Sequence, residues 1–122
     1  MITSRIQAII AEGMTIPKPA AKAQHVVKGW GMRRSEPALI YQIPNHKSPG
    51  NSYEKGITVS EFEMAFNELY SSNEFTRAWF NKHMPACARE GSCNFTSIGG
   101  IFEILGVAEY SGQGRYRRRR PV

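Results

Sequence analysis

Long apolar runs and cysteines are both scarce in this sequence. No apolar run approaches the roughly 18 residues that a membrane span needs. The first twelve residues hold four isoleucines, but Arg5 and Glu12 interrupt them, and no small-residue cleavage site marks a signal peptide. We therefore expect a cytoplasmic protein with no membrane partner.

Motifs that carry enzyme chemistry are absent as well. The chain has no phosphate-binding G-x-x-x-x-G-K-[ST] loop, no G-x-G-x-x-G after a strand, no H-E-x-x-H and no G-x-S-x-G. Its three histidines, His25, His46 and His83, are scattered along the chain. We expect no catalytic residues and no cofactor.

The two cysteines leave three alternatives open. Cys87 and Cys93 follow His83 in an H-x3-C-x5-C spacing, whereas structural zinc sites need four ligands and usually have tighter cysteine pairs. A fourth ligand could come from His46 or an acid. A disulfide would be unusual in a reducing cytoplasm. The spacing favours the third alternative, two partly buried free thiols, so no metal is expected.

The positive charge is concentrated at the two ends of the chain. The net charge is +6, with a balance of +5 in residues 1–56, −4 in residues 57–110 and +5 in residues 111–122. Solubility alone does not require such a division. It indicates an anionic partner that the ends of the chain contact, most often nucleic acid.

The first half of the chain predicts a helix and a β-hairpin. Isoleucines at helical spacing predict a helix over 3–12. Residues 25–31 and 38–43 are rich in β-branched and aromatic side chains and are predicted as strands, with a turn at 35–37. Residues 44–56 hold two prolines and two glycines, which is typical of a loop.

The second half is more strongly patterned. Thr58 and Glu61 fit a capping box at the start of an amphipathic helix over 59–71. A second helix is expected from a cap at Asn73 to the residue before Pro85. A third, capped by Thr96, is expected over 97–105. Residues 107–118 then predict a strand, a turn with two glycines, and a second strand.

Three helices followed by a glycine-tipped hairpin resemble a winged helix-turn-helix. The sequence from Phe102 to Arg117 carries the resemblance, because Gly106 follows the third helix and Gly112 and Gly114 mark a short wing. The resemblance covers 57–119. It implies a third helix in the major groove of DNA and a wing on the backbone or minor groove.

The predicted fold class is therefore α+β in a single domain over residues 1–122. The N-terminal helix and β-hairpin, in residues 1–56, would pack with the C-terminal three-helix plus wing unit, in residues 57–119.

The predicted third helix departs from that pattern. It has no basic residue, and its one charge, Glu103, would be repelled by phosphate. Its apolar composition predicts a helix packed in the core. An alternative function follows from the same residues: the apolar helix 97–105, with Gly99 and Gly100, could serve a non-enzymatic interaction module, including a homodimer.

The C-terminal wing gives the main functional hypothesis. Five arginines surround one tyrosine, and arginine grips phosphate through two parallel hydrogen bonds. Strand alternation predicts one face with Arg115, Arg117 and Arg119, and another with Tyr116 and Arg118. The tyrosine could stack on bases or anchor the strand. The alternatives are docking on an acidic protein, pairing with the acidic middle segment, and a solvated tail.

A second basic cluster lies in the first half of the chain. Lys28, Arg33 and Arg34 flank Trp30, whose glycine neighbours give it little cover, although it could also pack on the core. The sequence thus predicts a small protein that binds nucleic acid, DNA rather than RNA, mainly through the phosphate backbone. The predicted contacts are Lys28, Trp30, Arg33, Arg34, Arg115, Tyr116, Arg117, Arg118, Arg119 and Arg120.

Overall fold

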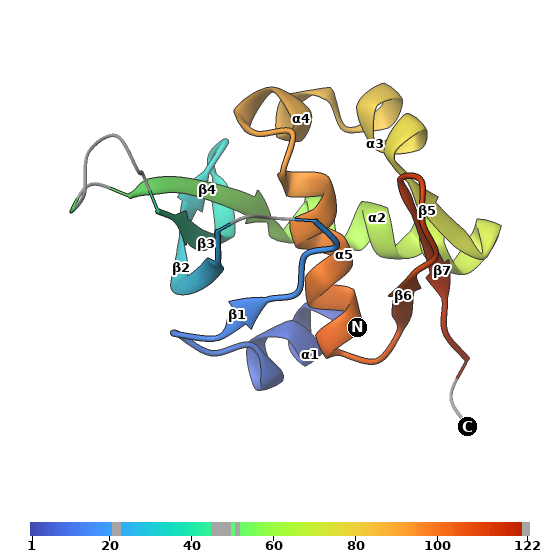
Figure 1. Ribbon diagram of the computed structural model, residues 1–122, viewed down its shortest axis with the longest axis horizontal. Coiled ribbons are helices and arrows are strands. Elements are labelled where there is room, and N and C mark those ends of the chain that lie inside the picture. Colours follow the sequence, from blue (N-terminus) through green and yellow to red (C-terminus); the bar gives the residue numbers. More distant parts are fainter. Residues whose placement is uncertain (21–22, 45–49, 51, 121–122) are drawn as a thin grey trace.

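The computed structural model describes residues 1–20, 23–44, 50 and 52–120 (Figure 1). It is a mixed structure of helices and strands, as the α+β prediction requires. In chain order the elements are α1 (Ile2–Ile9), β1 (Thr15–Ile16), β2 (His25–Arg33), β3 (Glu36–Ile43), β4 (Tyr53–Thr58), α2 (Val59–Ser72), β5 (Glu74–Thr76), α3 (Arg77–His83), α4 (Pro85–Glu90), α5 (Asn94–Ile104), β6 (Ala108–Tyr110) and β7 (Arg115–Arg118). None of the helices in these described ranges is long and apolar enough to cross a bilayer.

The first sheet has the antiparallel order β1-β2-β3-β4. The predicted hairpin is confirmed, because β2 pairs with β3 from Val26–Gln42 to Arg33–Glu36. Its turn lies at Arg34 and Ser35, not at 35–37. Both residues have positive φ, 49° and 63°. Such a two-residue turn matches the right-handed twist of the strands it joins.

The end of the predicted loop is a strand. Tyr53 to Thr58 form β4 and pair with β3, so the loop prediction over 44–56 was wrong for residues 53–56. Gly56 allows this pairing, because a side chain there would collide with Ile40 and Arg33 of the neighbouring strands. The sequence pattern of residues 44–56 could not reveal a pairing partner supplied by β3.

A second, three-stranded sheet has the antiparallel order β5-β7-β6. The predicted C-terminal hairpin is confirmed as β6 and β7. The short strand β5 was missed. Asn73 ends α2 with a left-handed φ of 63°, so the prediction that it caps the next helix was wrong. The cap of α3 is Thr76, and Pro85 begins a separate helix, α4.

Helix α5 runs through the middle of the molecule, between the two sheets (Figure 1). It begins at Asn94, earlier than predicted, and most of its residues are buried, including Phe95, Ile98 and Phe102. One hydrophobic core joins both halves of the chain, from Ile2 to Tyr116. The interpretation of the third predicted helix as a core helix is confirmed.

The capping box at the start of α2 is present, and it gives a direct test of the local structure. The Glu61 amide donates to the Thr58 hydroxyl at 3.2 Å, and the Thr58 amide donates to the Glu61 carboxylate at 2.8 Å. Replacing Thr58 by alanine should lower the free energy of unfolding by about 1 kcal/mol. Chemical denaturation measures this loss, and Thr58→Ser, which keeps the hydroxyl, should restore most of it. Equal losses in both variants would contradict a capping role.

Candidate nucleic-acid interface

The side chains of strand β7 alternate between the two faces of the sheet, as predicted. Arg115 and Arg117 are exposed, whereas Tyr116 is fully buried. The Tyr116 ring lies against Phe95, with ring centroids 5.4 Å apart, and its hydroxyl donates to the Thr96 carbonyl at 3.4 Å. Tyr116 therefore anchors the strand to α5. A stacking role for Tyr116 on nucleic-acid bases is excluded by its burial.

Both outward arginines of β7 face an acid across the sheet. Arg117 pairs with Glu109 at 2.6 Å, and Arg115 pairs with Glu74 at 3.5 Å. The Arg115 side chain remains 60% exposed, and the Arg117 side chain remains 66% exposed. A hydrogen bond from Arg117 keeps the pKa of Glu109 below its usual value. Exposed ion pairs contribute little to stability, so a phosphate can replace these acids.

The remaining arginines of the C-terminal segment differ from one another. Arg118 lies over the Tyr70 ring at 3.8 Å and donates to the Tyr70 carbonyl at 3.2 Å, so it packs on α2, and its contact with nucleic acid stays a prediction. Arg119 and Arg120 are exposed, and the Arg119 amide donates to the Val107 carbonyl at 2.8 Å. Within residues 108–120, Arg119 and Arg120 are thus exposed arginines that form no ion pair with a described residue.

Most of the second basic cluster forms ion pairs within the protein. Arg34 donates twice to Glu61, at 2.7 and 2.9 Å, and also pairs with Glu90. Arg33 pairs with Glu90 at 3.1 Å. These bonds attach the tip of the first hairpin to α2 and α4. Carboxylates already neutralise Arg33 and Arg34, so a contact of these two residues with nucleic acid would have to compete with ion pairs inside the protein, and it stays a prediction.

Lys28 and Trp30 remain at the surface of β2. Trp30 is 40% exposed, and Lys28 pairs with Glu54 at 2.6 Å. They border a hollow of about 300 Å³ that Gly31 and Ile40 also line. Figure 1 places β2 and β7 at opposite ends of the long axis, so the two basic clusters do not share one groove.

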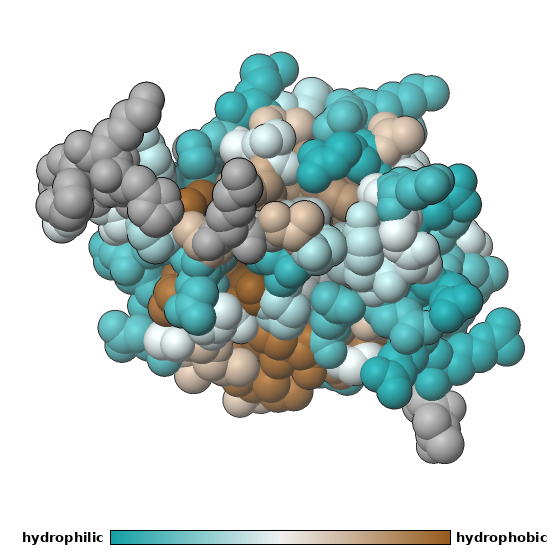
Figure 2. Space-filling view, viewed as in Figure 1, coloured by the Kyte–Doolittle hydropathy of each residue, from teal (hydrophilic) through white to brown (hydrophobic). Residues whose placement is uncertain are grey.

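Sequence reasoning missed a basic residue beside the wing. The Arg77 amide donates to the Gly114 carbonyl at 2.9 Å, and its guanidinium lies over the Phe95 ring at 4.7 Å. Residues 77–89 contain no acid, a signal hidden by the net negative charge of the larger segment 57–110. Figure 2 shows hydrophilic residues gathered over the end of the molecule where β5 and β7 lie.

A second missed residue is Lys18, which lies between Pro17 and Pro19 in a segment where no helix or strand is expected from the sequence. Its amino group donates to the Cys93 carbonyl and to the hydroxyls of Thr96 and Ser97, at 3.0, 2.9 and 2.6 Å. The segment around Pro17 therefore lies along the first turns of α5. The only signal in the sequence was a lysine between two prolines, which does not identify a partner 75 or more residues away.

The cysteines are free thiols. Cys87 is buried, and burial raises the pKa of its thiol, which makes it a poor nucleophile. Cys93 is half-buried, with its sulfur 3.1 Å from the Tyr41 hydroxyl. Within the described ranges, no three His, Cys, Asp or Glu side chains are grouped to hold a metal ion. His46, a possible fourth ligand, lies outside the described residues.

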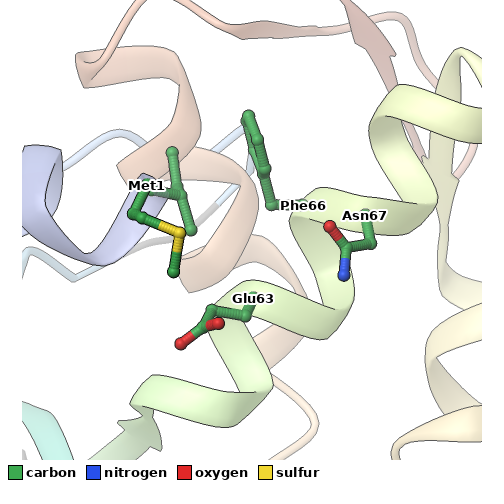
Figure 3. A pocket seen from close by; sticks show the side chains of 5 residues that line it. Met1, Glu63, Phe66 and Asn67 are labelled. Atoms are coloured by element: carbon green, nitrogen blue, oxygen red, sulfur yellow. The ribbon is translucent and has the colours of Figure 1, made fainter.

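The alternative interaction surface on helix 97–105 is contradicted by burial. Gly99 faces the Tyr116 ring and Gly100 faces Pro17, so this chain itself covers both glycines. A different apolar area lies over the N-terminal helix (Figure 2), where Met1 and Ile9 are exposed. A hollow of about 120 Å³ lies between α1 and α2, where Figure 3 shows Met1 near Glu63 and Phe66.

The C-terminal part of the chain, from α2 to β7, has the order helix, strand, three helices, strand, strand. Its short strand β5 lies beside β7, so all three strands form one sheet. Comparisons with protein-family models, curated proteins and solved structures find no match to this chain. A functional conclusion therefore rests on the residues of this chain.

Proposed function

We propose that this protein binds nucleic acid, DNA in preference to RNA, through phosphate contacts from a C-terminal wing. The wing is defined here as residues 108–120, and its contact residues are Arg115, Arg117, Arg119 and Arg120. The proposal assigns no enzymatic step to the protein. Base readout is not part of it, because the buried α5 offers no polar row to a groove.

Two features of the topology support a winged-helix arrangement for α2 to β7. Helices α2, α3 and α5 precede a hairpin, and the strand β5 between the first two helices pairs with β7 of that hairpin. The added helix α4 is a departure from the three-helix pattern. Fold-level similarity does not decide function, since many winged helices bind proteins.

The observation that carries the proposal is the placement of exposed arginines on an anchored strand. Tyr116 fixes β7 on the core, so Arg115 and Arg117 project from a rigid base and lose less freedom on binding. Arg119 follows, with its backbone held by Val107. Each arginine that neutralises a phosphate releases counterions, which makes such binding depend strongly on salt.

The test is the salt dependence of binding to duplex DNA, single-stranded DNA and RNA of equal length. A triple variant with Arg115, Arg117 and Arg119 replaced by alanine should lose three phosphate contacts. Its slope of log K against log salt should fall by about 3. Fluorescence anisotropy at several salt concentrations measures this slope.

A matched control removes the same charge elsewhere. Replacing Arg5, Lys82 and Arg89 by alanine also lowers the formal net charge from +6 to +3, but leaves the wing intact. This control should keep the wild-type slope to within about 1. Equal slopes for both triple variants, or no binding of any polynucleotide at low salt, would refute the proposal.

A further inference from the structure

A pocket lies between the segment after β1, the start of α5 and the end of β6. Its volume is about 300 Å³, at the lower end of the range of small-molecule sites. Lys18, His25, Cys93, Thr96 and Tyr110 line it. No acid occurs among the described residues that line this pocket.

Lys18 brings a positive charge to the pocket. The pKa of its amine is lowered to about 8, mainly by burial and to a smaller extent by the nearby Arg77 charge, against the opposing effect of Cys93. One of the three acceptors of Lys18, the Cys93 carbonyl, does not depend on Lys18 for a hydrogen bond. The Cys93 carbonyl that accepts from Lys18 also accepts from the Ser97 amide at 3.0 Å and the Thr96 hydroxyl at 3.1 Å. Lys18 can therefore turn one N–H toward a ligand without leaving that carbonyl unpaired.

His25 is the second basic group in the pocket. It is 7% exposed, and its Nδ1 atom is buried with no hydrogen-bond partner among the described residues. Its ring stacks on Tyr41, with centroids 5.8 Å apart. Burial and the charge of Lys18 lower the pKa of His25 to about 4. Because the Nδ1 atom is itself buried, a ligand in the pocket would reach the ring through the small part of it that is exposed.

The remaining groups around the pocket also favour negative charge. The amino end of α5, which begins at Asn94, carries the partial positive charge of the helix dipole. The Tyr110 hydroxyl accepts from the Gly114 amide at 3.3 Å, so its own O–H remains available to donate. Arg77 lies close by at the wing turn. The charges of Lys18 and Arg77 repel one another, and an anion in the pocket would stabilise both of them and also a proton on His25.

We propose that this pocket binds a phosphate group, with Lys18, His25 and Tyr110 as hydrogen-bond donors. A phosphate has several acceptor oxygens and a charge of up to two, which matches one cation, an imidazole that can take up a proton and a hydroxyl better than a single carboxylate does. The pocket does not include the wing arginines, so the inference stands apart from the proposed function. Because Tyr110 and Gly114 belong to the wing, the phosphate would lie beside the wing turn.

The first experiment uses the wild-type protein and inorganic phosphate. Protonation of His25 is followed by NMR as a function of pH, with chloride at equal ionic strength as the reference. Phosphate should raise the pKa of His25 from about 4 toward its ordinary value of about 6.5, because the anion stabilises the imidazolium. His83, which is exposed on α3, is an internal control and should not respond in the same way. A pKa of His25 that is identical in phosphate and chloride would overturn the inference.

Variants then assign the contacts. Lys18→Met should weaken phosphate binding by about 10- to 100-fold, the loss expected for a charged hydrogen-bond donor. Tyr110→Phe, which removes only one hydroxyl, should weaken binding by about 2- to 10-fold and serves if Lys18→Met does not fold. Lys28→Met removes the same charge far from the pocket and should bind phosphate as the wild type does. Unchanged affinity in Tyr110→Phe and in folded Lys18→Met would also overturn the inference.

Two oligonucleotides identify the source of the phosphate. A strand with a 5′-phosphate and the same strand with a 5′-hydroxyl are each tested for displacement of inorganic phosphate. Displacement by the first strand alone assigns a terminal phosphate, and displacement by neither assigns a small phosphate ester. The wing triple variant should still show the response of His25 to phosphate, so failure of the wing proposal and failure of the pocket proposal are distinguishable.

Discussion

Replacing Gly99 by alanine is expected to destabilise the protein by about 3 kcal/mol or more, a cost at or above the upper end for overpacked cores. A Cβ at position 99 would lie 2.1 Å from Cζ of Tyr116. The Tyr116 ring is buried against Phe95, so it has no free space into which to move. Thermal or chemical denaturation measures the loss. The direction of the change in the free energy of unfolding is informative, because replacing glycine by alanine in an ordinary helix stabilises by about 1 kcal/mol.

A double-mutant cycle tests the cause of this loss. Tyr116→Leu removes the ring atoms that the new methyl group would meet, at a cost of its own in core packing. In the Tyr116→Leu background, Gly99→Ala should be close to neutral or stabilising. Additive losses of stability in the double variant would show that the clash with Tyr116 is not the reason.

Replacing Arg34 by methionine is expected to lower the free energy of unfolding by about 2 kcal/mol, less than the roughly 3–5 kcal/mol for a fully buried ion pair, because the Arg34 side chain is 24% exposed. The loss leaves Glu61 without its bidentate partner and Glu90 with only Arg33 as a cation. It also removes the bond to the Gly56 carbonyl, 2.9 Å away. Urea denaturation at neutral pH measures the loss, and Arg34→Lys should recover only part of it, because lysine cannot form the two parallel bonds. Lys28→Met, which removes an exposed pair, should lower the free energy of unfolding far less than Arg34→Met does.

The ion pairs of Arg33 and Arg34 with Glu90 make the free energy of unfolding depend on pH. Burial alone raises the pKa of Glu90, but hydrogen bonds from Arg34 and Arg33 outweigh this effect and hold the pKa below its ordinary value. The pair therefore stabilises the fold fully above the unfolded pKa of about 4.3. Its contribution is lost as the pH falls through the lower folded value. The stability difference between wild type and Arg34→Met should shrink between neutral pH and pH about 3, and a constant difference would contradict this role of Glu90.

Elements with strong local signals were predictable from the sequence. The α2 capping box joins Thr58 and Glu61, three residues apart, so the sequence alone contains both partners. The two hairpins also follow from local patterns of β-branched residues and turns. Strands β4 and β5 were not predictable in the same way. Their short segments become strands because β3 and β7 supply partners, and pairing outweighs weak local preference.

The candidate interface was predictable only in part. Alternation along the wing gave the outward direction of Arg115 and Arg117 correctly, because it depends only on the strand geometry. The sequence could not show that Tyr116 and Arg118 are packed on the core and on Tyr70. The Lys18 pocket was entirely hidden, since its groups come from separate parts of the chain.

The sequence by itself determined where most helices and strands form, and that positive charge is concentrated at both ends. Only the tertiary structure decided which of those charges are free. The carboxylates that neutralise Arg34 lie 27 and 56 residues away from it, and distances of this kind leave no local pattern. Charge is a property of each residue, whereas availability depends on what the fold places beside it.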